Sequence, residues 1–344
     1  MNWRNTLALA ALGAGAALAA GRRRQPPFRF AGKAVLITGG SRGLGLVMAR
    51  MLADQGARLA IMARGLEDIE QAGQELSARG ARVLAIQGDV RRPEEARRAV
   101  EHVVEQFGRI DVLINNAGVI QFGPLAHMTV DDFRDALDVH LWGPVHTSLA
   151  AAAHMRRQGG GRIVNIASFA GQVAAPHLVP YSTSKFALVG FSDGLRAELA
   201  ADNIRVTTVC PGLMRTGSHL QAMFKGRHEQ EFAWFAIFDS LPLLSIDARA
   251  AAAAILDACR RGDPSLTLTL PARVLTGASG LFPDLVAAFM EVVARALPSP
   301  AGAEGNIIRR GWESASPLAP SLLTALNDRA AAANNNQPQH AAPR

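Results

Sequence analysis

Three side chains suited to proton transfer lie within a short stretch of the chain, at Ser168, Tyr181 and Lys185. Ser168 follows the apolar run 163–167, which predicts a strand, and Tyr181 and Lys185 are four residues apart, one turn of a helix. A hydroxyl, a phenol and an ammonium would then meet at the carboxyl end of a strand, where open α/β sheets bind ligands. A Tyr-x-x-x-Lys pair alone is usually a surface pair. Tyr181, however, is the only tyrosine in the chain, and Lys185 is one of three lysines.

These side chains suit the interconversion of a carbonyl and an alcohol. A free tyrosine has a pKa of about 10, and a neighbouring lysine cation lowers that pKa toward the range in which acid–base catalysis works best. The hydroxyl of Ser168 can hydrogen-bond the substrate oxygen and hold it against Tyr181. The reaction also needs a hydride carrier, which protein side chains cannot supply.

A glycine-rich turn joins a predicted strand to a predicted amphipathic helix. The run 34–37 is continuously apolar, and residues 44–52 carry apolar side chains at i, i+3, i+4, i+7 and i+8. Glycines let the backbone approach a phosphate, and the helix N-terminus favours its negative charge. We therefore expect a dinucleotide site rather than a purely structural turn. The turn residues expected to bind the cofactor are Gly39, Ser41, Arg42, Gly43, Leu44 and Gly45.

The end of the second predicted strand, 58–62, indicates which dinucleotide binds. NAD-binding folds place an acidic residue about 20 residues after the glycines, on the ribose 2′-hydroxyl. Here Ala63 and Arg64 occupy that place, Arg42 lies in the glycine turn, and Asp68 is too far along the next helix to substitute. Two cations without a carboxylate suit a 2′-phosphate, so NADP(H) is expected over NAD(H). The alternative is that Arg64 is a solvated residue at a helix start.

The third and fourth predicted strands, 82–86 and 110–114, are also followed by residues suited to a cofactor. Asp89 and Val90 follow the third strand, where an adenine could lie. Asn116, Ala117 and Gly118 follow the fourth, where small side chains let the backbone pass close to a ligand. The neighbouring asparagines can tie adjacent strands together. We assign no metal site.

Taken in order, these motifs resemble the classical short-chain dehydrogenases/reductases over about residues 30–270. The resemblance implies a Rossmann-like doubly wound parallel sheet of about seven strands with helices on both faces, and a homodimer or homotetramer. It implies that Tyr181 is the acid/base, that Lys185 binds the nicotinamide ribose, and that Ser168 polarises the carbonyl. The motifs are T-G-x-x-x-G-x-G at 38–45, D-V at 89–90, N-N-A-G at 115–118, Ser168, Y-x-x-x-K at 181–185, and Pro211-Gly212 with Thr216, which would position the nicotinamide.

One position departs from the family pattern. The family's fourth catalytic residue is an asparagine on the helix after N-N-A-G, and the matching place here holds His140. A histidine keeps the backbone carbonyl and could bridge the same water, and it could titrate near its free pKa of about 6.5. The alternative is that the side chain is merely tolerated. If His140 takes part, His140→Asn changes the pH–rate profile.

The remainder of the domain, within residues 33–271, predicts a lid at about 213–246. This segment holds Met214, Met223 and several aromatic side chains, which would suit a lipophilic small-molecule substrate. The equally serious alternative is that the aromatic side chains fill the lid's own core. An apolar extension at 272–298 predicts an amphipathic helix on a membrane or a neighbouring subunit. The tail 299–344, rich in Ala, Pro and Asn, is expected to be mostly disordered, apart from a short helix near Leu322.

The N-terminal segment 1–32 contains an uncharged run of 15 residues, 6–20, bounded by arginines. It is short for a membrane span of about 20 residues. We expect residues 6–20 to attach the protein to the cytoplasmic face of a membrane, with the body in the cytoplasm; the alternative is a helical arm packed on the protein. Two cysteines argue against a disulfide framework.

The net charge of +7 raises the possibility of nucleic-acid binding, but the arginines are scattered and no nucleic-acid motif accompanies them, so we expect no nucleic-acid partner. The leading hypothesis is an NADP-dependent oxidoreductase. The alternatives are a non-catalytic NADP(H)-binding sensor or scaffold at a membrane, and an epimerase or dehydratase on the same fold.

Overall fold

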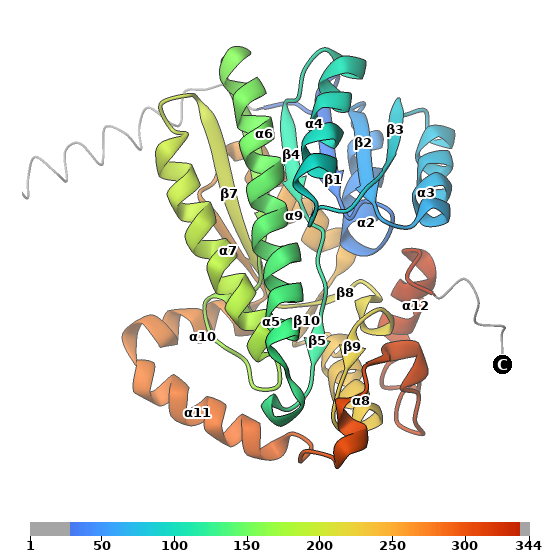
Figure 1. The fold of residues 1–344 in the computed structure, drawn as a ribbon, viewed down its shortest axis with the longest axis vertical. Coiled ribbons are helices and arrows are strands. Elements are labelled where there is room, and N and C mark those ends of the chain that lie inside the picture. The colour runs from blue at the N-terminus through green and yellow to red at the C-terminus, as the bar shows by residue number, and fades with distance from the viewer. Residues whose placement is uncertain (1–27, 338–344) are drawn as a thin grey trace, which may run out of the picture.

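The computed structural model describes residues 28–337, and its centre is a seven-stranded parallel sheet with helices on both faces (Figure 1). The strand order is β11-β7-β6-β4-β1-β2-β3. This Rossmann-like, doubly wound α/β fold is the predicted one, and the five strands predicted at 34–37, 58–62, 82–86, 110–114 and 163–167 lie within about two residues of those positions. The strands are β1 (Ala34–Thr38), β2 (Arg58–Ala63), β3 (Val83–Gln87), β4 (Val112–Asn115), β6 (Gly161–Ile166), β7 (Ile204–Pro211) and β11 (Ser265–Leu268).

Two apolar cores flank the sheet, because successive side chains of each strand point to opposite faces. In β1, Val35 and Ile37 pack into one core, and Ala34 and Leu36 pack into the other. Both faces are covered, which explains why the strands read as continuous apolar runs. The helices of the first face are α2 (Gly43–Ala53), α3 (Leu66–Ala78) and α9 (Ala248–Arg261), and those of the second are α4 (Pro93–Phe107), α6 (Gly143–Arg157) and α7 (Val179–Glu198).

The strand order reverses between β1 and β4, which marks the place where such sheets bind ligands. Asparagine side chains tie the strand ends together there, as predicted. Asn116 Nδ2 donates to the carbonyl oxygens of Thr38 and Gly39 at 3.1 and 3.0 Å. Asn115 Nδ2 donates to Asn165 Oδ1 at 2.8 Å and so joins β4 to β6. These buried hydrogen bonds hold the rim of the sheet in one geometry.

Smaller elements build a cap over this edge of the sheet. Helix α5 (Val130–Leu137) leads through a π-helical turn (Asp138–Trp142) into α6. Helix α8 (His228–Ser240) lies in the predicted lid segment, beside two small sheets. In one sheet β8 (Leu213–Arg215) pairs with β10 (Ser245–Asp247). In the other, the central strand β9 (Met223–Phe224) pairs with β5 (Gln121–Phe122) and with β12 (Arg309–Arg310).

The extension after β11 forms a helical hairpin that projects from the body (lower left in Figure 1). It consists of α10 (Leu270–Leu281) and α11 (Pro283–Ala296), the second of which is the predicted amphipathic helix. No helix within residues 28–337 is long and apolar enough to cross a bilayer. The run 6–20 and the membrane attachment expected of it lie outside the described residues.

The prediction of a mostly disordered tail is wrong for residues 299–337. This segment folds against the lid through β12 and α12 (Ala325–Ala333), which packs on α8 (right side of Figure 1). The expected short helix begins three residues after Leu322. The physical reason is that a few polar side chains, chiefly Asn327 and Asn336, are buried in long-range hydrogen bonds. Composition carries no information on such partners.

Candidate active site

Ser168, Tyr181 and Lys185 converge on one cavity of about 690 Å³ at the carboxyl end of the sheet. Ser168 follows β6, and its hydroxyl accepts a hydrogen bond from the N–H of Ala170 at 3.1 Å. Tyr181 and Lys185 lie one turn apart in α7, as predicted. Lys185 Nζ lies 5.5 Å from the centre of the Tyr181 ring and donates to the carbonyl oxygen of Ile166 at 2.9 Å. The fold thus assembles the trio that the spacing indicates.

Burial shifts the pKa values of the two proton-carrying groups, Tyr181 and Lys185, in opposite directions. It raises the pKa of Tyr181 to about 12 and lowers the pKa of Lys185 to about 7, because an apolar site disfavours both the phenolate and the ammonium. The hydroxyl of Ser168 partly offsets the rise in the pKa of Tyr181. The expected lowering of the tyrosine pKa is therefore wrong, since desolvation is the largest contribution and the neighbouring Cys210 and Asp239 act in the same direction. The protonated phenol is the form that can donate to a carbonyl oxygen.

His140 lies in the π-helical turn between α5 and α6, and it is buried. Its Nε2 accepts a hydrogen bond from the N–H of Val119 at 3.1 Å. Its Nδ1 lies 2.8 Å from Ser184 Oγ, and this hydroxyl donates to the backbone carbonyl of Tyr181 at 2.7 Å. Because the serine proton is already used, Nδ1 must carry the hydrogen and the imidazole is neutral.

The environment of His140 does not favour the titration considered from the sequence. Burial and then the charge of Lys185 lower the pKa of His140 well below 6.5. Its ring meets the Tyr181 ring edge-on, with 5.3 Å between centres. Both ring nitrogens are occupied by Val119 and Ser184. His140 therefore positions α7 and the segment after β4, and we describe it as a positioning residue.

The glycine loop between β1 and α2 forms a cradle at the other end of the cavity. Gly39 and Gly43 have φ angles of 65° and 55°, a conformation that glycine adopts without strain. A Cβ at Gly45 would lie 2.1 Å from the carbonyl oxygen of Gly39, so no side chain fits there. Helix α2 begins without a capping side chain, and its positive end favours an anion. This cradle fits a dinucleotide pyrophosphate.

Two predicted cations, Arg42 and Arg64, line the same cavity beside the glycine loop. The guanidinium of Arg42 lies 3.8 Å from the carboxylate of Asp68, which also lines the cavity, so the prediction that Asp68 lies too far along its helix to reach this site is wrong. Burial lowers the pKa of Arg42, and the charge of Arg64 contributes in the same direction. Asp89 also lines the cavity, but its carboxylate is held by Arg91 at 2.6 Å. The two arginines thus line the same cavity, and the charge of Arg64 acts on Arg42.

The opposite wall carries the lid. Of the predicted lid side chains, Met214 and Phe235 line the cavity, whereas Phe224 and Phe232 are buried in the lid's own core. The packing alternative is therefore confirmed for the latter two. The predicted site residues that line the cavity are Gly39, Ser41, Arg42, Gly43, Leu44, Arg64, Asp89, Val90, Asn116, Ala117, Gly118, His140, Ser168, Tyr181, Lys185, Pro211, Gly212 and Thr216, and Gly45 lies directly behind them.

Several cavity residues were not identified from the sequence. Asp239 of α8 lines the wall near Tyr181, and burial raises its pKa to about 6. Arg310, Trp312 and Asn336 reach the cavity from the C-terminal segment. No local pattern marks Arg310, Trp312 and Asn336. They lie far along the chain from every motif, in a stretch whose composition is typical of disorder.

Comparison with known proteins identifies the family. The family model for short chain dehydrogenases matches residues 33–224. An uncharacterized oxidoreductase of Thermotoga maritima is 39% identical over 183 residues, covering 53% of this chain and 72% of that protein. A short chain dehydrogenase from Burkholderia cenocepacia, solved with NADP, is 32% identical with a TM-score of 0.61, covering 72% of this chain and 100% of that one.

A second solved structure shows that the fold also accommodates the other dinucleotide. NAD+-bound xylitol dehydrogenase is 29% identical with a TM-score of 0.60, covering 70% of this chain and 99% of that one. The similar structures thus include proteins with either dinucleotide. The family model spans more than half of the chain, so the protein belongs to the short-chain dehydrogenase/reductase family of oxidoreductases.

Proposed function

We propose that the protein is an NADP-dependent oxidoreductase that interconverts a carbonyl and an alcohol on a lipophilic small molecule. The observation that carries this proposal is the convergence of Ser168, Tyr181 and Lys185 with the glycine loop on one cavity. A proton donor and a cradle for a hydride carrier in one cavity are what such a reaction needs.

Each of the three side chains has a definite task in carbonyl reduction. The bound dinucleotide supplies the hydride. Ser168 hydrogen-bonds the substrate oxygen, and Tyr181 donates its proton to that oxygen. Lys185, held by the carbonyl of Ile166 beside the phenol, stabilises the phenolate that forms as the proton leaves. In alcohol oxidation the same phenolate takes the proton back.

The preference for NADP rests on residues of this chain, since similar structures include an NAD+ complex. Arg42 and Arg64 line the cavity where the ribose 2′ position would lie, and Ala63 occupies the place of an acidic residue at the end of β2. A guanidinium binds a phosphate through paired hydrogen bonds, whereas a ribose hydroxyl gains little from a second cation.

The lipophilic substrate is proposed from the wall opposite the glycine loop. Leu178, Met214 and Phe235 line the cavity on the Tyr181 side. Apolar walls with a small number of polar groups are typical of small-molecule sites. Asp239 is the exception, and its carboxylate oxygens accept hydrogen bonds from the N–H of Met214 at 3.0 Å and from Asn327 Nδ2 at 2.7 Å.

The direct test is NADPH consumption by the purified protein against ketones, aldehydes, quinones, steroids and fatty-chain carbonyls. We expect turnover with apolar carbonyls and a higher kcat/KM with NADPH than with NADH. NADPH binding without turnover on any carbonyl would favour the sensor or scaffold. Product formation without net NADPH consumption would favour an epimerase or dehydratase. Either result would contradict the proposal.

A further inference from the structure

The C-terminal segment, residues 298–337, touches both walls of the cofactor cavity. On the glycine-loop wall, the carbonyl oxygen of Asn334 accepts a hydrogen bond from the N–H of Gly43 at 2.8 Å. On the lid wall, Asn336 Nδ2 donates to the carbonyl oxygen of Thr216 at 2.7 Å. Asn336 is 3% exposed and itself lines the cavity. The segment therefore bridges the cavity between two positions that the cofactor is expected to contact.

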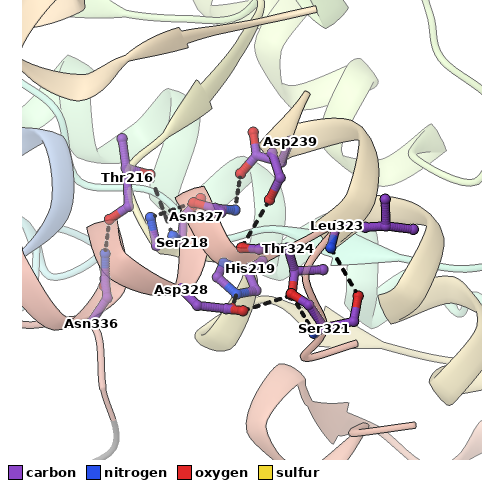
Figure 2. Close-up of polar contacts among 12 residues, drawn as sticks. Thr216, Ser218, His219, Asp239, Ser321, Leu323, Thr324, Asn327, Asp328 and Asn336 are labelled. Carbon is purple, nitrogen blue, oxygen red and sulfur yellow. Dashed lines mark hydrogen bonds and ion pairs between the residues drawn. The ribbon is translucent and has the colours of Figure 1, made fainter. Parts of the chain in front are cut away.

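Side-chain hydrogen bonds fix this segment in place (Figure 2). Asn327 of α12 accepts from the N–H of Gly217 at 2.9 Å and donates to Asp239 at 2.7 Å. Asp328, the residue after Asn327 in α12, pairs with His219 at 3.0 Å. Asn327 is fully buried, so its position is specific. The segment is as much a part of the cavity wall as the lid is.

Strand β12 carries a third arginine into the cavity. Its antiparallel pairing with β9 places Arg310 half-buried beside the lid, in the cavity that Arg42 and Arg64 also line. One guanidinium nitrogen of Arg310 donates to the carbonyl oxygen of Gln221 at 3.1 Å. The guanidinium lies 5.9 Å from the ring of Trp312. The carboxylate of Glu313 accepts a hydrogen bond from the backbone N–H of Arg310 at 2.7 Å and acts electrostatically on its guanidinium.

The three guanidiniums influence one another electrostatically. Burial lowers the pKa of Arg310, and the charge of Arg64 adds to the effect. Burial likewise lowers the pKa of Arg42, and both other arginines contribute to that shift. Like charges gathered in a partly buried cavity are unfavourable unless an anion compensates them. The carboxylate of Asp68, 3.8 Å from the guanidinium of Arg42, compensates part of this charge. The positive charge that remains around the cavity suits a ligand with a dianionic group.

We propose that Arg310 binds the 2′-phosphate of NADP together with Arg42 and Arg64, so that the C-terminal segment is part of the cofactor site. This inference rests on the proposed NADP dependence and adds a specificity-determining residue from outside the glycine loop and β2. The contact with Gln221 uses one of the five N–H donors of the guanidinium, so further donors are available to a phosphate. A purely structural role, through Gln221 and Trp312, would instead affect NADPH and NADH binding equally.

The test compares dissociation constants for NADPH and NADH in the full-length protein. For Arg310→Gln we expect NADPH binding to weaken about tenfold or more, the equivalent of about 1.4 kcal/mol, and NADH binding to change less than about twofold. Arg309→Gln is the matched control, because Arg309 is the exposed neighbour in β12. It should leave both constants within about twofold of the wild type.

Equal weakening for both dinucleotides, or no change for either, would overturn the proposal. If Arg310→Gln does not fold, Arg310→Lys carries the same test, since it keeps the charge but loses the planar fork. It should weaken NADPH binding selectively but by a smaller factor. A wild-type protein that binds NADH as tightly as NADPH would refute the cofactor preference itself. Selective NADPH binding by the wild type with an unaffected Arg310→Gln would refute only the role of Arg310.

Discussion

The two walls of the cofactor cavity are built in different ways. One wall consists of strand ends and the glycine loop, held by the parallel sheet and by asparagines such as Asn116. The other consists of the lid and the C-terminal segment, held by side-chain hydrogen bonds between distant parts of the chain, such as that of Asn327 with Asp239. The residues that match the family model, 33–224, include the glycine loop, Ser168, Tyr181 and Lys185, and they end within the lid.

The two walls therefore differ in the groups that they provide. The first provides groups for the reaction, and the second provides groups that contact the ligand. The wall within the family match supplies the proton donor and the cradle for the dinucleotide, for which the geometry is demanding. The wall built from the lid and the C-terminal segment supplies Asp239, Arg310, Trp312 and Asn336, which lie beyond the residues that match the family model. We therefore expect substitutions in the first wall to affect turnover and substitutions in the second to affect binding and local stability.

The largest effect is expected from Tyr181→Phe in the first wall. The change removes the proton donor and leaves the ring, so turnover should fall about 100-fold or more. NADPH affinity should stay within about threefold of the wild type, because the cradle is untouched. Steady-state kinetics with the best carbonyl substrate and an NADPH titration measure both quantities. A variant that keeps more than about a tenth of the activity would show that another group donates the proton.

An intermediate effect is expected from Asn327→Leu in the second wall. The change leaves the carboxylate of Asp239 and the N–H of Gly217 without their buried partner, which costs on the order of 1–3 kcal/mol. The lid and the C-terminal segment should then exchange their amide hydrogens faster, while β1 and α2 stay protected. Hydrogen-exchange mass spectrometry measures this pattern.

The matched control for Asn327→Leu is Arg329→Ala, on the exposed face of the same helix. It should leave exchange unchanged and alter stability by less than about 0.5 kcal/mol. Faster exchange throughout the sheet in Asn327→Leu would mean that the two walls unfold together, and it would contradict their separate construction.

The smallest effect is expected from His140→Asn, which should leave the pH dependence of turnover unchanged. A pKa lowered well below 6.5 means that the ring has already lost its second proton at neutral pH, so no charge on it changes between about pH 6.5 and 9. The variant should lower kcat through lost positioning of Ser184 and Val119, with the shape of the pH–rate profile preserved. A shifted inflection in that profile would restore the titrating role considered from the sequence.

Much of the first wall could be predicted from the sequence, because its signals are local. The glycine loop directly follows the five-residue buried strand β1, and Tyr181 and Lys185 are one helical turn apart. Similar local signals, the apolar runs, located five strands of the parallel sheet, β1 to β4 and β6.

The second wall could not be predicted, because its contacts join distant residues. Asn336 contacts Thr216 across 120 residues, and Arg310 contacts Gln221 across 89. An Ala- and Asn-rich tail has the composition of a disordered segment, and only the packed structure shows that its asparagines have buried partners. Burial also explains the error about the pKa of Tyr181, because the desolvation of a side chain depends on the whole fold and cannot be judged from a neighbouring lysine.

The most direct test of the central claim is deuterium transfer from NADPH labelled at the nicotinamide C4 position. With a carbonyl substrate found in the panel, we predict that the product alcohol carries deuterium on its former carbonyl carbon, and that Tyr181→Phe slows this transfer without changing the position of the label. Product that forms without deuterium at that carbon, using either C4-labelled epimer of NADPH, would contradict hydride transfer in this cavity.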